Sequence, residues 1–475
     1  LRRDVWLIAD GIAMQVQVGY GVRCGRYTNM GANMAEEQGT VETMLPVISA
    51  GVLGTTVGWY GFFLCGFFAA TVFPVVFFPN LSPLDGVIAA FIISFVGFAA
   101  RPVGGALFGW FGDRIGRRST LAATMLLMSI ATTMIGVLPG YATLGVFAWF
   151  LLIILRFLQG VGMGGEWGGA VLLAMEYGDD RRRGFWTSWS QVSVPIALAL
   201  SALAVLFFEY LYPGMAFESI GWRMPFFLGA MLALVGFYIR LRIPETPVFS
   251  AIKAEKKVVK APLVEAFRYN WREILCATLA RAGEQAPFYL FTTFLFSYGV
   301  GTLGLGVSLL NEGIVLGALA SCVLMPTFAA ISDRVGRKLW FVMGMAVTGV
   351  YAVPYFWLLA TKDPWCVTLA ILLSLSICHA WTYGVQAALI AEQFATPVRY
   401  TGASLGFQLA SLVFGGPAPL IATYLLANQA RLMPEYPGYV LIAAYIVAMV
   451  VISLIAVLFL NEYAGRAPAG NNGRC

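Results

Sequence analysis

The stretch DRIGRR, residues 113–118, lies between two long apolar runs and recurs later in the chain as DRVGRK, residues 333–338. Both copies combine an acid, several bases and a central glycine in the same order. Each copy follows the second apolar run of its half of the chain and precedes the third. We therefore predict a duplicated protein whose two halves share one series of apolar segments.

The composition indicates that these segments are membrane spans. Of the 475 residues, 59% are hydrophobic and only 11% are charged, whereas about a quarter are charged in soluble domains. Crossing a hydrocarbon core of about 30 Å takes roughly 20 helical residues. Runs of this length are predicted near residues 46–72, 86–109, 120–139, 144–175, 185–208, 222–241, 273–299, 306–331, 339–360, 366–391, 401–427 and 437–460.

The positive charges predict the orientation of these twelve spans. Connections that follow even-numbered spans carry eighteen Lys and Arg residues, whereas the odd-numbered connections carry only Arg223, Lys362 and Arg431. Because cytoplasmic loops are enriched in Lys and Arg, we expect the even-numbered connections and both termini to be cytoplasmic.

The longest and most basic connection separates six spans from six. The expected organisation is an N-terminal arm without regular structure (1–43), a six-helix bundle (44–241), a basic central loop (242–272), a second six-helix bundle (273–460) and a short tail (461–475). The fold class is thus an all-α membrane protein with two bundles. The arm, the central loop and the tail are all expected on the cytoplasmic side.

Several function classes are not supported. The net charge of +6 is explained by membrane orientation, so we expect no nucleic-acid partner. The seven cysteines are scattered without metal-ligand spacing, so we predict neither a metal nor a cofactor. No nucleophile elbow, HExxH or phosphate loop occurs, and an enzyme is therefore not expected. The expected partners are the lipid bilayer and a small solute, bound by a monomer.

The repeated motif resembles the signature of the major facilitator superfamily. Gly109 precedes the first copy at the spacing of that signature, and the second copy departs only by having Ala329 at the equivalent position. Within the superfamily, the chain resembles the metabolite:proton symporters. The stretches that carry this resemblance are GTT (54–56), WY (59–60), FF (62–63), RPVGG (101–105), RFLQG (156–160), GGEWGG (164–169) and GWRMPF (221–226).

This resemblance implies uptake of a small metabolite such as shikimate, 2-oxoglutarate, citrate, proline or betaine, driven by protons. One departure concerns the coupling. Members of the group carry two acids around the Trp59-Tyr60 pair, but this chain has Gly58 and Gly61 there. An uncoupled facilitator is therefore one alternative, and a receptor that kept the carrier fold is another.

Charges inside the spans are the natural site candidates, because an ion within the bilayer is costly unless it faces a cavity or a partner. Arg156 lies near the middle of the fourth span, where its guanidinium could bind a carboxylate with two parallel hydrogen bonds. A structural ion pair between helices is the competing interpretation. Arg281 and Glu284 share one face of the seventh span and could pair with each other. Arg281 is also a candidate substrate ligand, and Glu284 a candidate proton site.

Other candidates line the predicted cavity or its cytoplasmic exit. Tyr60, Tyr289 and Gln386 are candidate substrate contacts, and Glu166, among four glycines, is a second candidate for proton coupling or a gate. The lone His379 is interpreted as a hydrogen-bonded core residue. The candidate gating residues are Arg101, Asp113, Arg114, Arg117, Arg118, Glu176, Arg183, Asp333, Arg334, Glu392 and Arg399.

Two substrate classes stay open. Arginines in the second, fourth and seventh spans favour an anionic substrate, such as a shikimate-like or dicarboxylic acid. An osmolyte carrier for proline or betaine is the alternative. Osmolyte carriers of this group often end in a long cytoplasmic coiled coil, whereas this chain stops soon after the twelfth span. We therefore predict a proton-coupled organic-acid importer.

Overall fold

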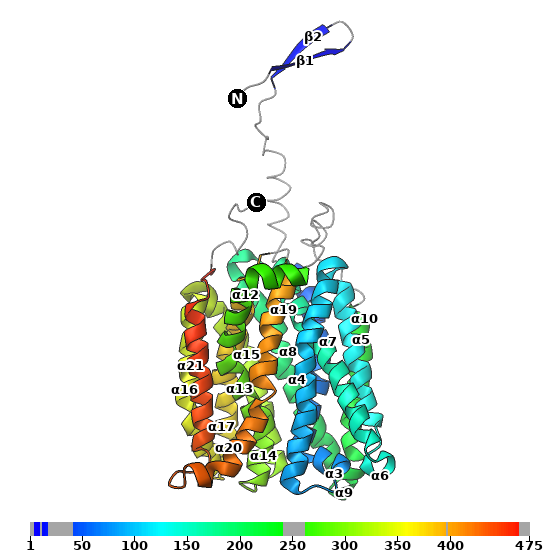
Figure 1. Ribbon diagram of the computed structural model, residues 1–475, viewed down its shortest axis with the longest axis vertical. Coiled ribbons are helices and arrows are strands. Elements are labelled where there is room, and N and C mark those ends of the chain that lie inside the picture. Colours follow the sequence, from blue (N-terminus) through cyan, green and yellow to red (C-terminus); the bar gives the residue numbers. More distant parts are fainter. Residues whose placement is uncertain (1–3, 10–11, 18–40, 241–261, 396–397, 465–475) are drawn as a thin grey trace.

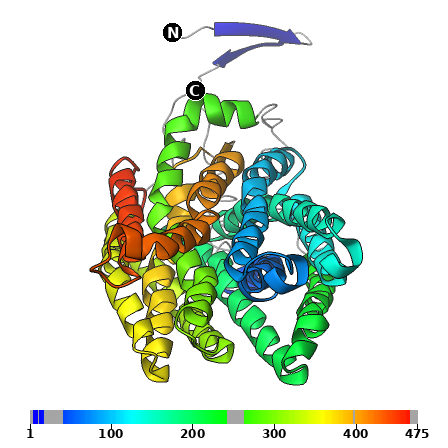
Figure 2. The ribbon, with the colours of Figure 1, turned by 60° about the horizontal axis from the view of Figure 1, so that its bottom comes forward.

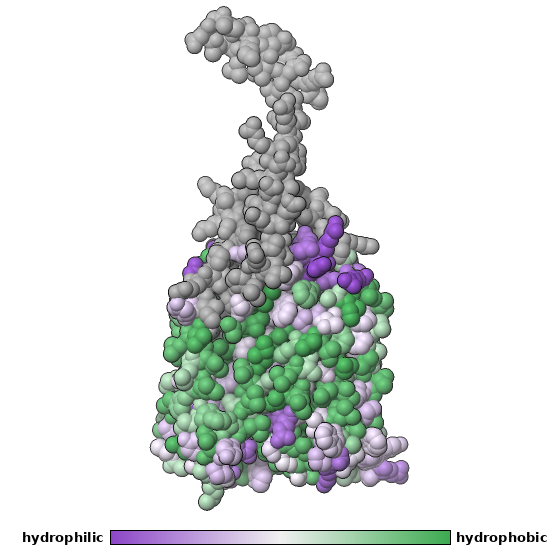
Figure 3. Space-filling model, turned by 180° about the vertical axis from the view of Figure 1, so that it is seen from behind, coloured by the Kyte–Doolittle hydropathy of each residue, from purple (hydrophilic) through white to green (hydrophobic). Residues whose placement is uncertain are grey.

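The computed structural model describes residues 4–9, 12–17, 41–240, 262–395 and 398–464. Two helical bundles stand side by side, one from each half of the chain (Figures 1 and 2). On the face shown in Figure 3, hydrophobic side chains form a broad belt across the bundles. The fold class predicted from the sequence is confirmed.

All twelve predicted spans fall on helical segments. The elements of the N-terminal half are α2 (Val41–Thr71), α3 (Phe73–Phe77), α4 (Pro83–Arg114), α5 (Arg117–Val137), α6 (Tyr141–Leu144), α7 (Phe147–Tyr177), η1 (Asp180–Arg182), α8 (Arg183–Leu211), α9 (Met215–Ser219), η2 (Gly221–Arg223) and α10 (Met224–Arg240). Those of the C-terminal half are α12 (Pro262–Ala280), α13 (Ala282–Tyr289), η3 (Leu290–Phe294), α14 (Leu295–Gly301), α15 (Val307–Val335), α16 (Arg337–Ala360), α17 (Pro364–Leu373), η4 (Ser374–His379), α18 (Ala380–Ala391), α19 (Arg399–Ala410), η6 (Ser411–Gly415), α20 (Ala418–Leu432) and α21 (Val440–Leu458).

The central glycines of the repeated motif turn the chain between two spans. Gly116 joins α4 to α5 with φ of 126°, and Gly336 joins α15 to α16 with φ of 106°. Residues with a Cβ rarely adopt positive φ, so glycine is the residue that makes these turns without strain. We call the end of the molecule that carries these two turns the motif end. The short helices α3, α6 and α9 lie at the opposite end (Figure 1).

Eleven helices within the described residues are long and apolar enough to cross a membrane. The segment missing from that count is the predicted seventh span, which the structure divides into α12, α13, η3 and α14. These pieces follow one another from the motif end towards the opposite end (Figure 1). The seventh span is therefore present as a broken helix.

A side chain from another helix causes the break. The Gly283 amide donates to Ser453 Oγ at 2.6 Å, and the Ser453 hydroxyl lies 3.3 Å from the Leu279 carbonyl oxygen. Ser453 thus bridges two backbone groups that would bond directly in a continuous helix. Pro287 removes a further helical hydrogen bond.

Two expectations need correction. Residues 1–43 were expected to lack regular structure, but β1 (Asp4–Ala9) and β2 (Ile12–Gln17) pair as an antiparallel hairpin, and α2 begins within this segment. The strands contain Val5, Trp6, Ile8, Ile12 and Val16, residue types that favour strands. The predicted central loop, residues 242–272, is helical from Pro262, with a kink at Asn270; its residues 242–261 lie outside the described residues.

Glycines let α4 and α7 cross in direct backbone contact. A Cβ at Gly164 would lie 2.0 Å from the Arg101 carbonyl oxygen, and one at Gly160 would lie 2.0 Å from that of Gly97. From the other side, a Cβ at Gly104 would lie 1.9 Å from the Val161 carbonyl oxygen. Small residues permit such close approach between membrane helices.

Gly164→Ala is expected to destabilise the protein by about 1–3 kcal/mol, because the added methyl group must push α4 away from α7. The thermal unfolding midpoint in detergent measures this effect. Gly51→Ala is the matched control, since a Cβ there meets nothing within 4 Å. Equal midpoints for the two variants would contradict the close contact between α4 and α7.

Candidate functional site

Arg101 on α4 is fully buried without an acidic partner. Its Nη2 atom donates to Tyr289 Oη at 3.4 Å, while Nε and Nη1 have no hydrogen-bond partner. The guanidinium carbon lies 4.1 Å from the ring centre of Phe62 and 4.4 Å from that of Phe98. Aromatic faces stabilise a cation but do not neutralise it.

Arg156 on α7 lies on the same aromatic ring. Its guanidinium carbon is 4.8 Å from the Phe62 centre. Nη1 donates to Gln159 Oε1 at 2.5 Å, Nη2 donates to the Ser94 carbonyl at 3.4 Å, and Nε has no partner. Within the described part of the chain, no carboxylate lies within salt-bridge distance of Arg101 or Arg156. Two positive charges are thus buried together without neutralisation.

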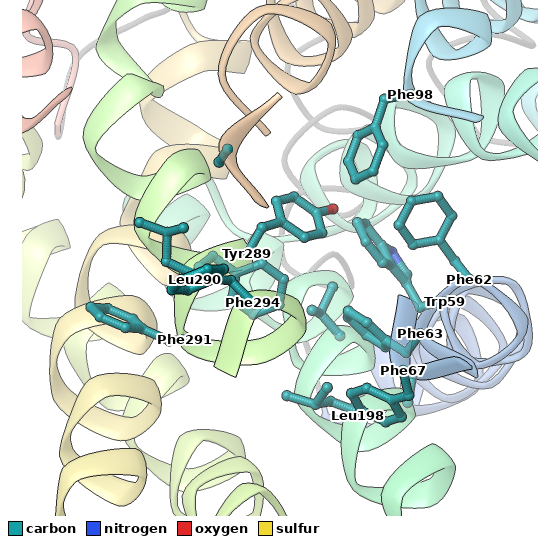
Figure 4. Packing of buried hydrophobic residues seen from close by; sticks show 14 of the residues in the cluster. Trp59, Phe62, Phe63, Phe67, Phe98, Leu198, Tyr289, Leu290, Phe291 and Phe294 are labelled. Atoms are coloured by element: carbon teal, nitrogen blue, oxygen red, sulfur yellow. The ribbon is translucent and has the colours of Figure 1, made fainter. Parts of the chain in front are cut away.

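A small cavity of about 20 Å³, which is room for about one water molecule, adjoins Arg156 between the two bundles. Its polar lining residues are Ser94, Arg156, Tyr289 and Thr293. Figure 4 shows the Tyr289 hydroxyl directed from the C-terminal bundle towards the rings of Phe98, Trp59 and Phe62. The remaining lining residues are Phe62, Phe63, Gly66, Phe91, Phe98, Gly416 and Pro419.

Arg281 lies at the break between α12 and α13. Among the described residues it has, unlike Arg101 and Arg156, an acidic partner, and it hydrogen-bonds through each of its guanidinium nitrogens. It donates to Glu284 Oε2 at 3.1 Å, to Gln386 Oε1 at 3.2 Å and to the Phe407 carbonyl at 2.5 Å. It also bonds Gln285. The predicted pairing of Arg281 with Glu284 is therefore present, and Gln386 contacts Arg281 rather than the cavity.

Side chains from neighbouring helices fill the space beside Gly58 and Gly61 of α2. A Cβ at Gly61 would lie 2.3 Å from Thr132 Oγ1, and one at Gly58 would lie 2.7 Å from Glu166 Oε2. Glu166 therefore brings its carboxylate from α7 to the place beside Gly58. Tyr60 donates to the Pro225 carbonyl at 2.7 Å and is not among the residues that line the cavity.

Asp333 connects the two bundles at the motif end. Its carboxylate accepts hydrogen bonds from the backbone amides of Gly184 and Phe185, at 2.8 and 2.9 Å, at the start of α8. An anion at a helix N-terminus is stabilised by unpaired amides and by the helix dipole. This contact therefore holds α15 of one bundle against α8 of the other.

Arg337 holds the acids of this connection in place. It donates to Asp333 at 2.7 Å and to the two oxygens of Glu392 at 2.6 and 2.8 Å. Arg183 lies 3.9 Å from Glu392. Arg337 was not among the predicted gating residues, although its counterpart Arg117 was; the repeat itself could have identified it.

The other predicted gating residues differ in their exposure and in their contacts. Arg334 and Arg114 are exposed, with Arg114 over the Trp110 ring at 4.6 Å. Arg399 donates to the Phe394 carbonyl at 2.9 Å. The side chains of Asp113 and Arg117 lie outside the described residues, Glu176 is buried, and Arg118 is half-buried.

Asp333→Asn is expected to weaken closure of the motif end roughly tenfold, because an amide replaces a carboxylate that caps α8 across the bundle interface. Spin labels at positions 181 and 334, one on each bundle, measure this as a larger population of long distances. Asp363→Asn is the matched control, since Asp363 caps α17 within one bundle. Unchanged distances in Asp333→Asn would contradict the connecting role.

Two helical bundles with buried charges at their interface define a polytopic membrane carrier. A family model described as Major Facilitator Superfamily matches residues 85–418. The chain belongs to this superfamily, as the repeated motif predicted.

Similar sequences are named as transport proteins. The chain is 34% identical to the inner membrane metabolite transport protein YhjE of Escherichia coli, covering 90% of this chain and 96% of the relative. It is 36% identical to the E. coli shikimate transporter, covering 86% and 92%. A glycine betaine/proline/ectoine/pipecolic acid transporter of Dickeya dadantii, OusA, is 33% identical, covering 89% and 84%.

The fold is also that of a solved carrier. The structure of the proton:xylose symporter XylE bound to 6-bromo-6-deoxy-D-glucose matches with a TM-score of 0.69 at 16% identity, over 90% of this chain and 98% of that chain. The protein is therefore a secondary transporter of the major facilitator superfamily and a multi-pass integral membrane protein, not an enzyme.

Proposed function

We propose that this transporter takes up a small organic acid whose carboxylate is bound between Arg101 and Arg156. The observation that carries this proposal is the absence of a carboxylate partner for either arginine among the described residues. Burying a charge without a partner is strongly unfavourable. An anionic substrate would supply the missing partner, and guanidinium groups match the geometry of a carboxylate.

The hydrogen bond between Arg101 and Tyr289 connects the proposed substrate site to both bundles. Arg101 and Arg156 belong to the N-terminal bundle, whereas Tyr289, which bonds Arg101, belongs to the C-terminal bundle. A carboxylate bound by the arginines would compete for the Arg101 group that now contacts Tyr289. Substrate binding would thereby alter a contact between the two moving bodies, as carriers that alternate their access require.

The structure is closed at the motif end, which we propose faces the cytoplasm together with both termini. The bundles are joined there by Asp333 and the start of α8. At the opposite end, a pocket of about 180 Å³ lies between the bundles, with Phe67 on one wall and Phe296 on the other. These two rings are in contact, with their centres 5.0 Å apart. We infer that the substrate enters through this pocket after the rings separate.

Glu284 is the proposed site of the coupling proton. It is buried on the broken helix, and Arg281 is the Lys or Arg residue that pairs with it among the described residues. Any displacement of Arg281 towards the substrate would leave the Glu284 carboxylate unpaired and favour its protonation. This assignment also fits the lack of acids at Gly58 and Gly61.

An osmolyte is the second candidate, because OusA is named as a transporter of betaine and proline. A zwitterion brings no net negative charge to two buried guanidinium groups. Moreover, the Phe62 and Phe98 faces that could hold a quaternary ammonium are already occupied by Arg101. The site therefore favours an acid.

Uptake of a labelled panel into proteoliposomes tests the proposal. The panel contains shikimate, 2-oxoglutarate, citrate, benzoate, proline and betaine, each measured with and without an inward proton gradient. We expect gradient-stimulated accumulation of one carboxylic acid. Accumulation of betaine or proline alone would contradict the organic-acid assignment, and equilibration that ignores the gradient would contradict coupling.

A further inference from the structure

His379 is a buried imidazole without a hydrogen bond. It is 5% exposed, and neither ring nitrogen has a hydrogen-bond partner in the part of the chain that the structure describes. Leaving a buried polar group unpaired is unfavourable, so the arrangement calls for an explanation. His379 is also the last residue of the π-helical segment η4, and such segments often occur at functional sites.

Two aromatic rings hold the imidazole in a fixed orientation. Phe288 stacks on it with ring centres 4.2 Å apart, and Tyr383 stacks on it at 4.7 Å. In this orientation Nδ1 lies 3.4 Å from Glu284 Oε1. The His379 ring is therefore placed against the one carboxylate oxygen that Arg281 does not hold.

The two oxygens of Glu284 differ in their surroundings. Oε2 accepts a hydrogen bond from Arg281 at 3.1 Å, which makes protonation of that oxygen unfavourable. A proton taken up by Glu284 would bind Oε1, and the new hydroxyl would need an acceptor in a buried site. The unprotonated Nδ1 of a neutral imidazole is such an acceptor.

We propose that His379 stays neutral and accepts a hydrogen bond from protonated Glu284, so that it stabilises the proton-loaded state of the carrier. This inference rests on the proposed role of Glu284. It makes His379 a positioning residue for the proton, which stays bonded to Glu284 Oε1 until it is released to solvent.

Several other titratable or charged groups surround Glu284 and His379, and replacing His379 leaves all of them unchanged. Arg281 and Tyr289 belong to the broken seventh helix, Tyr383 and Gln386 to α18, and Tyr289 brings Arg101 of α4 near. In α16, Tyr355 packs on Phe291. The charged residues of α15 and α16, which also pack on η4, lie towards the helix ends: Glu312, Asp333, Arg334, Arg337 and Lys338.

The pH dependence of uptake tests this proposal. His379→Phe keeps an aromatic ring in the stack but removes the acceptor, so protonated Glu284 loses stability and more acid is needed to load it. We expect the external pH of half-maximal uptake to fall by about one unit, which is the tenfold effect of one hydrogen bond. Substrate exchange at acid pH, which requires no proton release, should continue.

His379→Asn supplies an amide oxygen near the position of Nδ1 and should bring the midpoint back to within about 0.3 units. An unchanged midpoint in His379→Phe would overturn the proposal. Loss of exchange in both variants would also overturn it, because that result indicates a packing role.

The Glu284→Gln background separates this proposal from the proposed function. With Glu284→Gln present, His379→Phe should cause no further change in accumulation or in the pH dependence of exchange, since the proton that it stabilises is absent. Accumulation that remains pH-driven in Glu284→Gln would instead show that Glu284 is not the coupling site. That outcome would reject the proposed coupling function whatever His379→Phe does.

Discussion

Replacement of Arg156 by lysine is expected to lower the transport efficiency, kcat/KM, for the preferred acid roughly 100-fold. The ammonium group of lysine keeps the charge but cannot reproduce the planar guanidinium fork. In the structure that fork spans Gln159 on one side and the Ser94 carbonyl on the other. Lysine has fewer hydrogen-bond donors than arginine. It would therefore leave either Gln159 and the Ser94 carbonyl or the substrate carboxylate without a donor in a buried site.

Uptake kinetics of the purified variant in proteoliposomes measure this effect. Arg268→Lys serves as the control, because Arg268 is exposed on α12 at the motif end. Thermal stability should be recorded for both variants, so that a folding defect is not taken for a binding defect. Unchanged kcat/KM in Arg156→Lys for every acid of the panel would remove Arg156 from the substrate site.

Glu284→Gln is expected to abolish accumulation driven by a proton gradient while substrate exchange continues. Glutamine keeps the shape of the side chain and can still accept a hydrogen bond from Arg281, but it cannot take up a proton. The internal concentration should therefore rise only to the external one, whereas the unchanged protein should concentrate the acid up to about tenfold under an inward gradient of one pH unit, the limit for one coupled proton.

The measurement compares gradient-driven uptake with exchange in the same proteoliposome preparation. Glu312→Gln is the matched control, since Glu312 is an exposed acid on α15 and should leave both activities intact. Accumulation by Glu284→Gln that equals that of the unchanged protein would place the coupling proton elsewhere, with buried Glu166 as the next residue to replace.

The sequence predicts the architecture well because its signals are local. Apolar runs of span length, basic connections and the repeated motif each depend on neighbouring residues, and the turns at Gly116 and Gly336 follow from the motif itself. The pairing of Arg281 with Glu284 was predictable for the same reason, because residues three apart share a helix face.

The remaining features of the site depend on contacts between distant segments. Ser453 breaks the seventh span from another helix, and the orientation of Arg101 towards Tyr289 depends on how the two bundles meet. Likewise, the contact of His379 with Glu284 joins two helices that are about a hundred residues apart in the chain. Hydrophobic periodicity and charge counts carry no information about such pairs.

The central claim is that the buried arginines recognise a carboxylate, and competition by matched acid and amide pairs tests it most directly. Exchange of the labelled substrate is measured against increasing concentrations of its unlabelled acid or of the corresponding carboxamide, which has the same shape without the charge. We predict that the acid competes at least tenfold better and that this preference disappears in the Arg101→Gln, Arg156→Gln double variant. Equal competition by acid and amide would contradict the claim.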